Sequence, residues 1–374
     1  MADDIVILAG ARTPFGAWSG GTDGSGAKGG RLQGQDPFDL AAAALKAALA
    51  GSGLEPRAVD EVVFGNAYHV GPHACYGGRY VGHRAGLPDS SPGKTVGLAC
   101  GSGLYAVAVA AQDLRLGAAS IAAAAGADAP SMVRKAVLIP SFTDLSAGEA
   151  IAASTHRTCL EAGISREDQD RWALRSHALA GKAQKSGLFA SEIVQVPGLA
   201  ADDLVLRDPA PEHFTRSEPL FEGSTPTHAS VHGIADGGSA LLLARGPAAG
   251  RIEPLGRLLA DAVTSEAPRR MALACAGALK RAVSEAGVRV EDIDLFEINE
   301  TFAGQVLADI KELGIPEEKV NVNGGAIALG HAFGGTGGRL VLTLLKELGR
   351  RNLRLGAAAI SVGGGQGVAV VVER

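Results

Sequence analysis

Short apolar runs alternate with segments of helical periodicity along most of the chain. In the first third, strand-like runs occupy residues 5–8 and 62–64, and helices are predicted to begin at Asp36 and after Gly101. Asp36 followed by Pro37 is typical of a helix start, because an acidic N-cap accepts from free backbone amides and proline fits the first turn. Continuous apolar strands that alternate with helices are typical of a parallel sheet covered on both faces. The pattern therefore predicts an α/β fold.

The second half of the chain repeats the first. Residues 44–60 match residues 278–294 at one constant spacing, through the same Ala-Leu-Lys triplet, glycine and aspartate. The string LRLGAA at residues 114–119 returns unchanged at residues 353–358. Each copy leads from a helix into an apolar strand, so we expect two duplicated, doubly wound halves.

A segment of different composition separates the two halves. It holds a charged helix start at residues 165–170 and a turn-rich, histidine-containing run at residues 211–232. We interpret this segment as an inserted lid (loop) domain. The predicted organisation is an N-terminal half (1–127), an inserted lid (128–248) and a C-terminal half (249–374).

Composition and charge exclude several classes of protein. The chain has 374 residues, of which 46% are apolar, enough for a large core and for more than one domain. A net charge of −5 without a basic cluster gives no support for nucleic-acid binding. No apolar run reaches the ~18 residues of a membrane span, and the first residues lack the basic segment of an export signal, so a cytoplasmic location is expected.

The cysteines and clustered histidines do not suggest a disulfide framework or a metal site. The four cysteines lie far apart without a CxxC pair. Gly71 and Pro72 interrupt the helix that neighbouring metal ligands would need, which argues against a zinc site made of His69, His73, Cys75 and His83.

Cys100 is the cysteine with the strongest case for chemistry. It follows an apolar run and precedes Gly101, after which residues 104–116 have helical character. A thiol at a helix N-terminus meets free backbone amides and the positive end of the helix dipole, which favour the thiolate. The alternative is a small cysteine packed as an apolar residue.

His331 lies in a glycine-dense loop that leads into a predicted helix at residues 339–348. Its counterpart in the repeat is the Cys100 loop. If the halves pack about a pseudo-twofold axis, the two loops meet and place an imidazole beside the thiol to take its proton. A structural histidine is the alternative, and the absence of a lysine excludes a phosphate-binding P-loop here.

Two more loops follow apolar strands of the second half. Asn299 comes after the strand at residues 294–298, where it could cap a helix or fix a water. Ser361 precedes Gly363, whose loop could form an anion-binding nest of backbone amides or a simple turn into the last strand.

Six strings spread over essentially the whole chain make it resemble the thiolase family of acyl-CoA C-acyltransferases. They are ARTPFG (11–16), CGSG (100–103), REDQD (166–170), NETFA (299–303), NVNGGAIALGH (321–331) and GGGQG (363–367). The resemblance implies the five-layered αβαβα thiolase fold with a lid, in agreement with the repeat.

The resemblance also implies a role for each candidate residue. Cys100 would be the acylated nucleophile, and His331 its base and one donor of an oxyanion site that a water held by Asn299 completes. The backbone amides of Cys100 and Gly363 would form a second oxyanion hole, worth ~3 kcal/mol per donor. Coenzyme A would be a substrate, and no permanently bound cofactor or metal is expected.

Ser361 departs from the family pattern, which has a second cysteine there as the acid/base of carbon-carbon chemistry. A hydroxyl is several pKa units less acidic than a thiol, so carbon-carbon chemistry should be slow while acylation of Cys100 need not suffer. Three explanations stay open: an engineered Cys-to-Ser form, a natural variant with altered chemistry, or a subunit whose partner does the work.

The predicted lid departs as well. The resemblance implies that Ser230, His232 and Phe302 contact coenzyme A, and His232, near the pantetheine arm, stands where the family has a serine. The lid is shorter than usual and lacks a stretch that often builds tetramers. We therefore expect a homodimer, with a dimer of dimers and an additional protein subunit as alternatives.

The sequence thus predicts a thiolase-type acyltransferase that cleaves 3-oxoacyl-CoA, or runs the reverse Claisen condensation, through an acyl-cysteine at Cys100. Degradation of fatty or aromatic acids is the expected context. Two alternatives remain: a ketosynthase-like or hydrolytic acyl-enzyme without carbon-carbon cleavage, and a non-catalytic thiolase-like subunit of a complex.

Overall fold

One ten-stranded sheet runs through the computed structural model, which describes residues 4–18 and 30–374. Its strands follow the order β10-β11-β12-β9-β1-β8-β5-β3-β4, with β2 paired to β8. Their bounds are β1 (Ile5–Arg12), β2 (Gly16–Ala17), β3 (Glu61–Gly65), β4 (Gly93–Val96), β5 (Ile121–Asp128), β8 (Ala235–Arg245), β9 (Gly256–Ser265), β10 (Leu295–Ile298), β11 (Leu355–Val362) and β12 (Gln366–Glu373).

The sheet consists of two similar parts joined by the antiparallel pairing of β1 with β9. In the first part β3 and β5 are parallel, and β8 and β1 follow antiparallel; in the second part β10 and β11 are parallel, and β12 and β9 follow antiparallel. The predicted α/β fold with two duplicated halves is confirmed.

The sheet is mixed, because antiparallel pairs accompany the parallel strands that the pattern predicts. A turn of three glycines, at residues 363–365, joins β11 to β12, and a connection this short can only return the chain antiparallel. β8, residues 235–245, lies inside the segment predicted as lid, yet it pairs antiparallel with both β1 and β5. The segment predicted as lid, residues 128–248, therefore contributes one strand to the central sheet.

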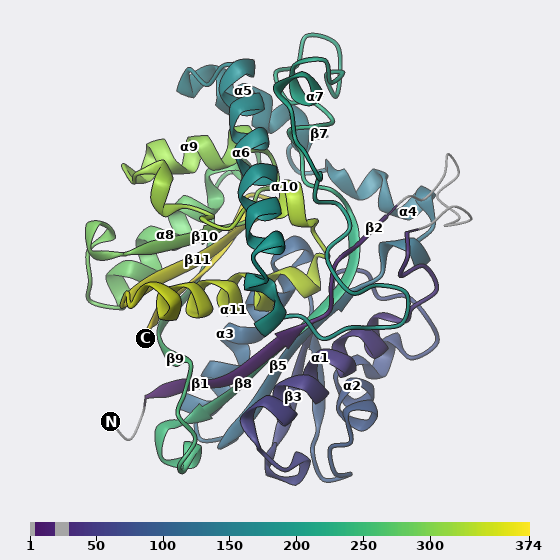
Figure 1. Cartoon of the computed structure of the whole chain (residues 1–374), viewed down its shortest axis with the longest axis vertical. Helices are drawn as coiled ribbons and strands as arrows, with labels where there is room; N and C mark the ends of the chain where they lie inside the picture. The colour runs from purple at the N-terminus through teal and green to yellow at the C-terminus, as the bar shows by residue number, and fades with distance from the viewer. Residues whose placement is uncertain (1–3, 19–29) are drawn as a thin grey trace.

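Helices form three layers around the two parts of the sheet (Figure 1). Helices α1 (Pro37–Ser52) and α2 (Gly77–Ala85) cover one outer face, and α8 (Ala274–Glu285) and α9 (Ala303–Leu313) cover the other. Helices α3 (Ser102–Arg115) and α11 (Gly334–Arg351) lie in the middle, contact each other and share one apolar core with both parts of the sheet. This is the predicted five-layered αβαβα arrangement.

The start of α1 shows how local sequence sets these elements. The Asp36 carboxylate accepts from the Phe38 amide at 2.7 Å, and Pro37 occupies the first turn. Gly53 ends the helix in the left-handed conformation, with φ of 71°. The helix start predicted from Asp36 and Pro37 is confirmed.

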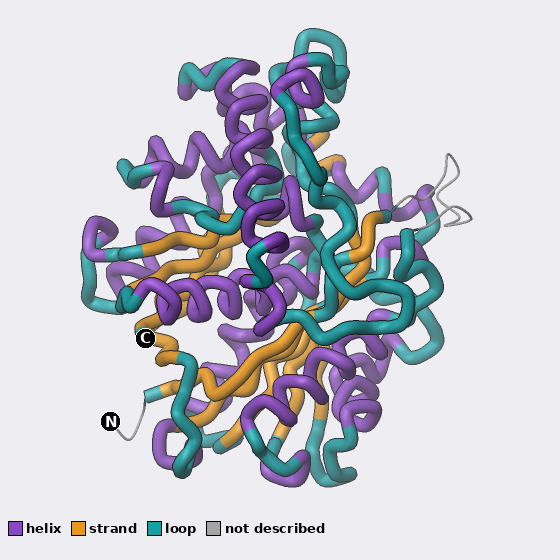
Figure 2. Tube along the Cα trace, in the orientation of Figure 1, coloured by secondary structure: helices purple, strands orange, loops and turns teal. Residues whose placement is uncertain are grey.

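The segment between β5 and β8 in the chain contains further helices and long irregular stretches, which extend from one end of the molecule toward its middle (Figure 2). They comprise α4 (Lys135–Leu138), β6 (Thr143–Asp144), β7 (Glu149–Ala150), α5 (Ile151–Ala162), α6 (Arg166–Lys185) and α7 (Pro211–Thr215). A reciprocal capping box of Ser165 and Asp168 starts α6. Within residues 4–18 and 30–374, no helix combines the length and apolar character of a membrane span.

Glycines allow α3 and α11 to approach at backbone distance. A Cβ added to Gly103 would lie 2.0 Å from the Gly334 oxygen, and one added to Gly337 would lie 1.9 Å from the Leu104 nitrogen. Side chains at these positions would force the helices apart. Because α3 follows Cys100 and α11 follows His331, this contact brings the two predicted catalytic loops together.

Candidate active site

Cys100 lies in a single turn of 3₁₀ helix, Ala99–Gly101, between β4 and the start of α3. Ala99 has φ of 41°, a left-handed conformation that a residue with a Cβ rarely adopts. The Ser102 hydroxyl braces the turn, since it accepts from the Leu98 amide at 2.9 Å and donates to the Ala99 oxygen at 2.7 Å. The fold therefore holds the thiol in a strained turn at a helix N-terminus, as the sequence predicts.

The protonation state of Cys100 differs from the expectation. The side chain is half-buried, and burial raises the pKa of its thiol to about 12, with a further increase from the negative charge of Asp128. Burial and the Asp128 charge thus oppose the thiolate that a helix N-terminus favours. A base must therefore remove the proton during attack.

His331 is fully buried in the loop between α10 (Ala326–Leu329) and α11. Its Nδ1 shares a hydrogen bond of 2.8 Å with the Thr336 hydroxyl, and its backbone amide donates to the Gly233 oxygen at 2.8 Å. Its Nε2 has no partner within the described residues. Burial, with the nearby His232 and Arg339, holds the pKa of His331 well below its usual value. The ring is thus fixed and neutral, with one nitrogen free.

Asn299 follows β10, and its backbone amide donates to the Ala359 oxygen of β11 at 2.9 Å. Its side-chain Nδ2 donates to the Thr301 hydroxyl at 3.3 Å, while Oδ1 is buried without a partner among the described residues. Buried polar atoms in native proteins almost always have a partner. The free Asn299 Oδ1 is therefore suited to hold a water or substrate group.

Ser361 and Gly363 lie at the end of β11. The Ser361 side chain is buried, and its hydroxyl accepts from the Cys275 amide at 3.1 Å. A Cβ at Gly363 would meet nothing within 4 Å, so open space adjoins its backbone. Gly101, next to Cys100, packs against Val362, between these two residues. The fold thus brings the Cys100 turn and the Ser361–Gly363 segment together.

A largely apolar cavity of about 200 Å³ adjoins His331. It is lined by Phe142, Ala150, Ile151, Ala152, Leu220, Val231, His232, Ile234 and Phe302. The His232 and His331 rings meet edge to face with centroids 4.7 Å apart. Two of the three residues predicted to contact coenzyme A, His232 and Phe302, line this cavity. Ser230 does not, because its buried hydroxyl accepts from the Thr227 amide at 2.8 Å.

Sequence reasoning missed the aromatic surroundings of His331. Phe333 packs on the His331 ring at 4.7 Å and on Tyr68 at 5.1 Å. Phe333 adopts φ of 42°, so the backbone is strained next to the histidine. Single aromatic residues in loops carry no sequence signal, which is why these contacts could not be predicted.

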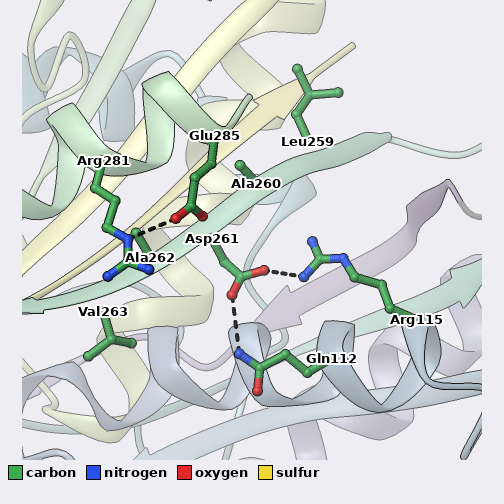
Figure 3. Close-up of a pocket in the computed structure, with 9 residues that line it drawn as sticks. All are labelled: Gln112, Arg115, Leu259, Ala260, Asp261, Ala262, Val263, Arg281 and Glu285. Atoms are coloured by element: carbon green, nitrogen blue, oxygen red, sulfur yellow. Dashed lines mark hydrogen bonds and ion pairs between the residues drawn. The ribbon is translucent and has the colours of Figure 1, made fainter. Parts of the chain in front are cut away.

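Outside this region, the charged groups of another hollow are paired with one another and are less available for catalysis. A surface hollow of about 450 Å³ between α3, β9 and α8 contains charged groups that pair with one another, Arg115 with Asp261 and Arg281 with Glu285 (Figure 3). In the part of the chain that the structure describes, no group of three or more His, Cys, Asp or Glu side chains could hold a metal.

We expect His232→Asn to weaken the acid sensitivity of the fold. Burial lowers the pKa of His232 to about 4, against about 6.5 in an unfolded chain. The unfolded state therefore binds a proton that the folded state excludes, so stability is full above about pH 6.5 and falls as the pH drops toward 4. In the parent, His232 Nδ1 donates to the Thr301 oxygen at 3.1 Å. The Nδ2 group of asparagine can replace this donor and does not titrate.

Urea unfolding at pH 7 and pH 4 measures this effect. The parent should lose about 3 kcal/mol more than His232→Asn over that interval. The His232→Asn protein should still lose some stability through His177 on α6, because burial also lowers the pKa of His177 to about 4. Equal losses in parent and His232→Asn would contradict the assignment.

Comparison with known proteins agrees with this geometry. Residues 5–137 and 128–246 match the thiolase N-terminal domain, and residues 252–374 match the thiolase C-terminal domain. The chain is 35% identical to an acetyl-CoA acetyltransferase of Chromobacterium violaceum, over 99% of this chain and 100% of that protein. It is 36% identical to a 3-ketoacyl-CoA thiolase of Bacillus subtilis, over 99% of each.

Solved structures show the same relation. The human mitochondrial 3-ketoacyl-CoA thiolase superimposes with a TM-score of 0.94 at 31% identity, covering 100% of this chain and 99% of that one. The same human enzyme in complex with CoA gives a TM-score of 0.93 at 30% identity, covering 99% and 98% of the two chains. The chain therefore belongs to the thiolase family of acyltransferases.

Proposed function

We propose that this thiolase transfers acyl groups to and from coenzyme A through a thioester on Cys100, and that it cleaves 3-oxoacyl-CoA. The observation that carries the proposal is the His331 ring, anchored at Nδ1 by Thr336 and free at Nε2. A neutral imidazole of this kind is able to take a proton from a protonated thiol as the sulfur attacks. The relatives' names, acetyl-CoA acetyltransferase and 3-ketoacyl-CoA thiolase, support the substrate class.

The proposed steps follow from the residues. The Cys100 sulfur attacks the 3-oxo carbon while its proton moves to His331 Nε2. Donors around the carbonyl oxygen, for which the backbone amides of Cys100 and Gly363 are the candidates, stabilise the oxyanion. The bond between C2 and C3 breaks, and the C2 carbanion takes the proton of the Ser361 hydroxyl. The thiol of a second coenzyme A then gives its proton to the Ser361 oxygen and takes the acyl group from Cys100, whose sulfur regains the proton held by His331.

Peptide mass spectrometry after incubation with an acyl-CoA tests the first step. The acyl mass should appear on the peptide that contains Cys100, and labelled coenzyme A should exchange into acyl-CoA. Cys75 is exposed, so Cys75→Ser is the matched control for non-specific thiol labelling and should keep the signal. No acyl mass at Cys100 would refute the proposal and favour the non-catalytic subunit.

Ser361→Cys should raise the kcat for thiolysis of 3-oxoacyl-CoA by about 10- to 100-fold. A thiol gives up and returns a proton at neutral pH far more readily than a hydroxyl, and general acid–base catalysis contributes 10² to 10⁴ in total. Exchange of coenzyme A through Cys100 should stay within about 2-fold of the parent, because that half-reaction makes no carbanion.

Comparison with Ser361→Ala completes the test, since alanine removes the proton carrier altogether and should lower thiolysis. Equal thiolysis by all three forms would favour the second candidate, an acyl-enzyme without carbon-carbon cleavage, which the serine at this position supports. The homodimer, the cytoplasmic location and the degradative role implied by the resemblance stay predictions.

A further inference from the structure

A buried polar cluster lies directly behind Ser361 and plays no part in the steps above. The Cys275 thiol, at the start of α8, donates to Oδ2 of Asp309 on α9 at 2.9 Å. Gln305 Nε2 donates to the same oxygen at 2.5 Å. Cys275, Gln305 and Asp309 are completely inaccessible to solvent. A thiol and a carboxylate thus meet inside a layer otherwise filled with apolar side chains.

Ser361 is connected to this cluster through Cys275. The Cys275 amide donates to the Ser361 hydroxyl oxygen at 3.1 Å, and a hydrogen bond from Ser361 also opposes the rise in the pKa of the Cys275 thiol. The amide occupies an acceptor position of the hydroxyl, so the hydroxyl's own proton is free to point at sulfur. With the hydroxyl proton directed at that sulfur, the donors would run in one direction, from Ser361 oxygen to Cys275 sulfur to the Asp309 carboxylate, of which the second bond is the one at 2.9 Å.

Gln305 fixes the orientation of the carboxylate end. Its Oε1 accepts from the Thr301 amide at 3.1 Å, so its NH₂ group must face Asp309. The Thr301 hydroxyl in turn accepts from Asn299 Nδ2 at 3.3 Å. One chain of hydrogen bonds therefore links two residues of the candidate active site, Asn299 and Ser361, through Asp309.

A purely structural role does not account for the carboxylate. Burial raises the pKa of Asp309 to about 7, and its Oδ1 has no hydrogen-bond partner among the described residues. A buried carboxylate left partly unsatisfied is costly compared with an apolar side chain of similar size. The Ala276 amide at the start of α8 stabilises the ionised form, but a neutral asparagine could cap that helix equally well.

We propose that Asp309, acting through Cys275, accepts and returns the proton that Ser361 exchanges with the substrate carbon. This rests on the proposed function of the Cys100 site. In condensation, the proton leaves C2 of the acyl-CoA for Ser361 oxygen, the hydroxyl proton passes to Cys275 sulfur, and the thiol proton passes to the Asp309 carboxylate. Cleavage runs the same transfers backwards, and no further reactant is needed. Cys275 and Asp309 are positioning residues that do not touch substrate.

Asp309→Asn tests the relay, because asparagine keeps the size and an oxygen acceptor but cannot take up the proton. The kcat of thiolysis should fall about 10- to 100-fold with KM within about 2-fold. Exchange of the C2 protons of acetyl-CoA with D₂O should fall by the same factor. Exchange of labelled coenzyme A through Cys100 should not change.

The Ser361→Cys background gives the decisive comparison. A thiol at residue 361 can hold the proton itself, so adding Asp309→Asn there should cost less than about 3-fold. If Asp309→Asn folds poorly, Cys275→Ala can be used instead, because removal of the thiol interrupts the relay and should lower thiolysis and C2-proton exchange in the same way. Cys159→Ser is the matched control, since Cys159 is equally buried in the same apolar layer but belongs to no chain leading to Ser361.

Each outcome decides a separate question. If Asp309→Asn lowers coenzyme A exchange and C2-proton exchange alike, or costs the same with Cys at residue 361, the residue is structural and the relay is refuted. If it changes neither exchange, the relay is likewise refuted. If the parent itself shows no coenzyme A exchange, the proposed function has failed, and the relay with it.

Discussion

Replacement of Cys100 by alanine should lower thiolysis and coenzyme A exchange by about 10⁴-fold or more, because the covalent route disappears with its nucleophile. The Cys100 turn is held by Ser102 and by glycine contacts rather than by the thiol, so the fold should persist. Initial rates with acetyl-CoA and a 3-oxoacyl-CoA measure the loss, and acyl mass at residue 100 should vanish.

Cys159→Ser supplies the comparison for losing a thiol elsewhere and should keep the parental rate. The Cys100→Ala protein should still bind its substrates, with a Kd for coenzyme A within about 3-fold of the parent. Retention of more than about a tenth of the parental rate by Cys100→Ala would overturn the assignment of the nucleophile.

Replacement of His331 by glutamine should reduce acylation of Cys100 by about 10² to 10⁴-fold, the range of general acid–base catalysis. Because the resting thiol has a pKa of about 12, attack at neutral pH depends on a base. Glutamine can still donate a hydrogen bond to an oxyanion but cannot accept the thiol proton. The variant thus separates the two roles assigned to His331.

Rapid-mix measurement of the acylation rate across pH 6 to 10 distinguishes the role of His331 as a base from its role as an oxyanion donor. With glutamine, the rate should rise about tenfold per pH unit over this range and stay below the parental rate, because a thiol with a pKa of about 12 is only slightly ionised even at pH 10. His177→Gln, a buried histidine on α6 away from the cavity at His331, should leave acylation unchanged. A loss with glutamine that is the same at every pH would contradict the assignment of His331 as the base.

Much of the architecture could be predicted because the chain carries it twice. Segment 44–60 contains the last turns of α1 and leads to β3, and segment 278–294 contains the last turns of α8 and leads to β10. These two strands occupy equivalent places in the two parts of the sheet. The position of Cys100 at a helix start was equally readable. The direction of β8 was not, because strand direction depends on how the chain returns from the lid.

The chemistry of the site was harder to predict than its position. The thiolate favoured at Cys100 by its place at a helix start took no account of burial or of the charge of Asp128, which is distant in the sequence, and both raise the pKa of the thiol. The cluster behind Ser361 joins Cys275, Asp309 and Ser361 from α8, α9 and β11, and no local pattern connects them. Each of these three residues, taken alone, looks like an ordinary part of its element.

The glycine contact between α3 and α11 limits where this enzyme can adapt to different acyl groups. At Gly103 and Gly337 the two helices meet backbone to backbone, so neither helix can shift toward the other without a clash. The Cys100 and His331 loops that precede them are therefore held in fixed positions relative to each other. We therefore expect any variation in chain-length preference to come from the cavity wall formed by Ala150, Ala152 and Leu220, which belong to the segment between β5 and β8. Reaction geometry and substrate range would then be encoded in separate stretches of the polypeptide, so that one could change during evolution while the other stayed fixed.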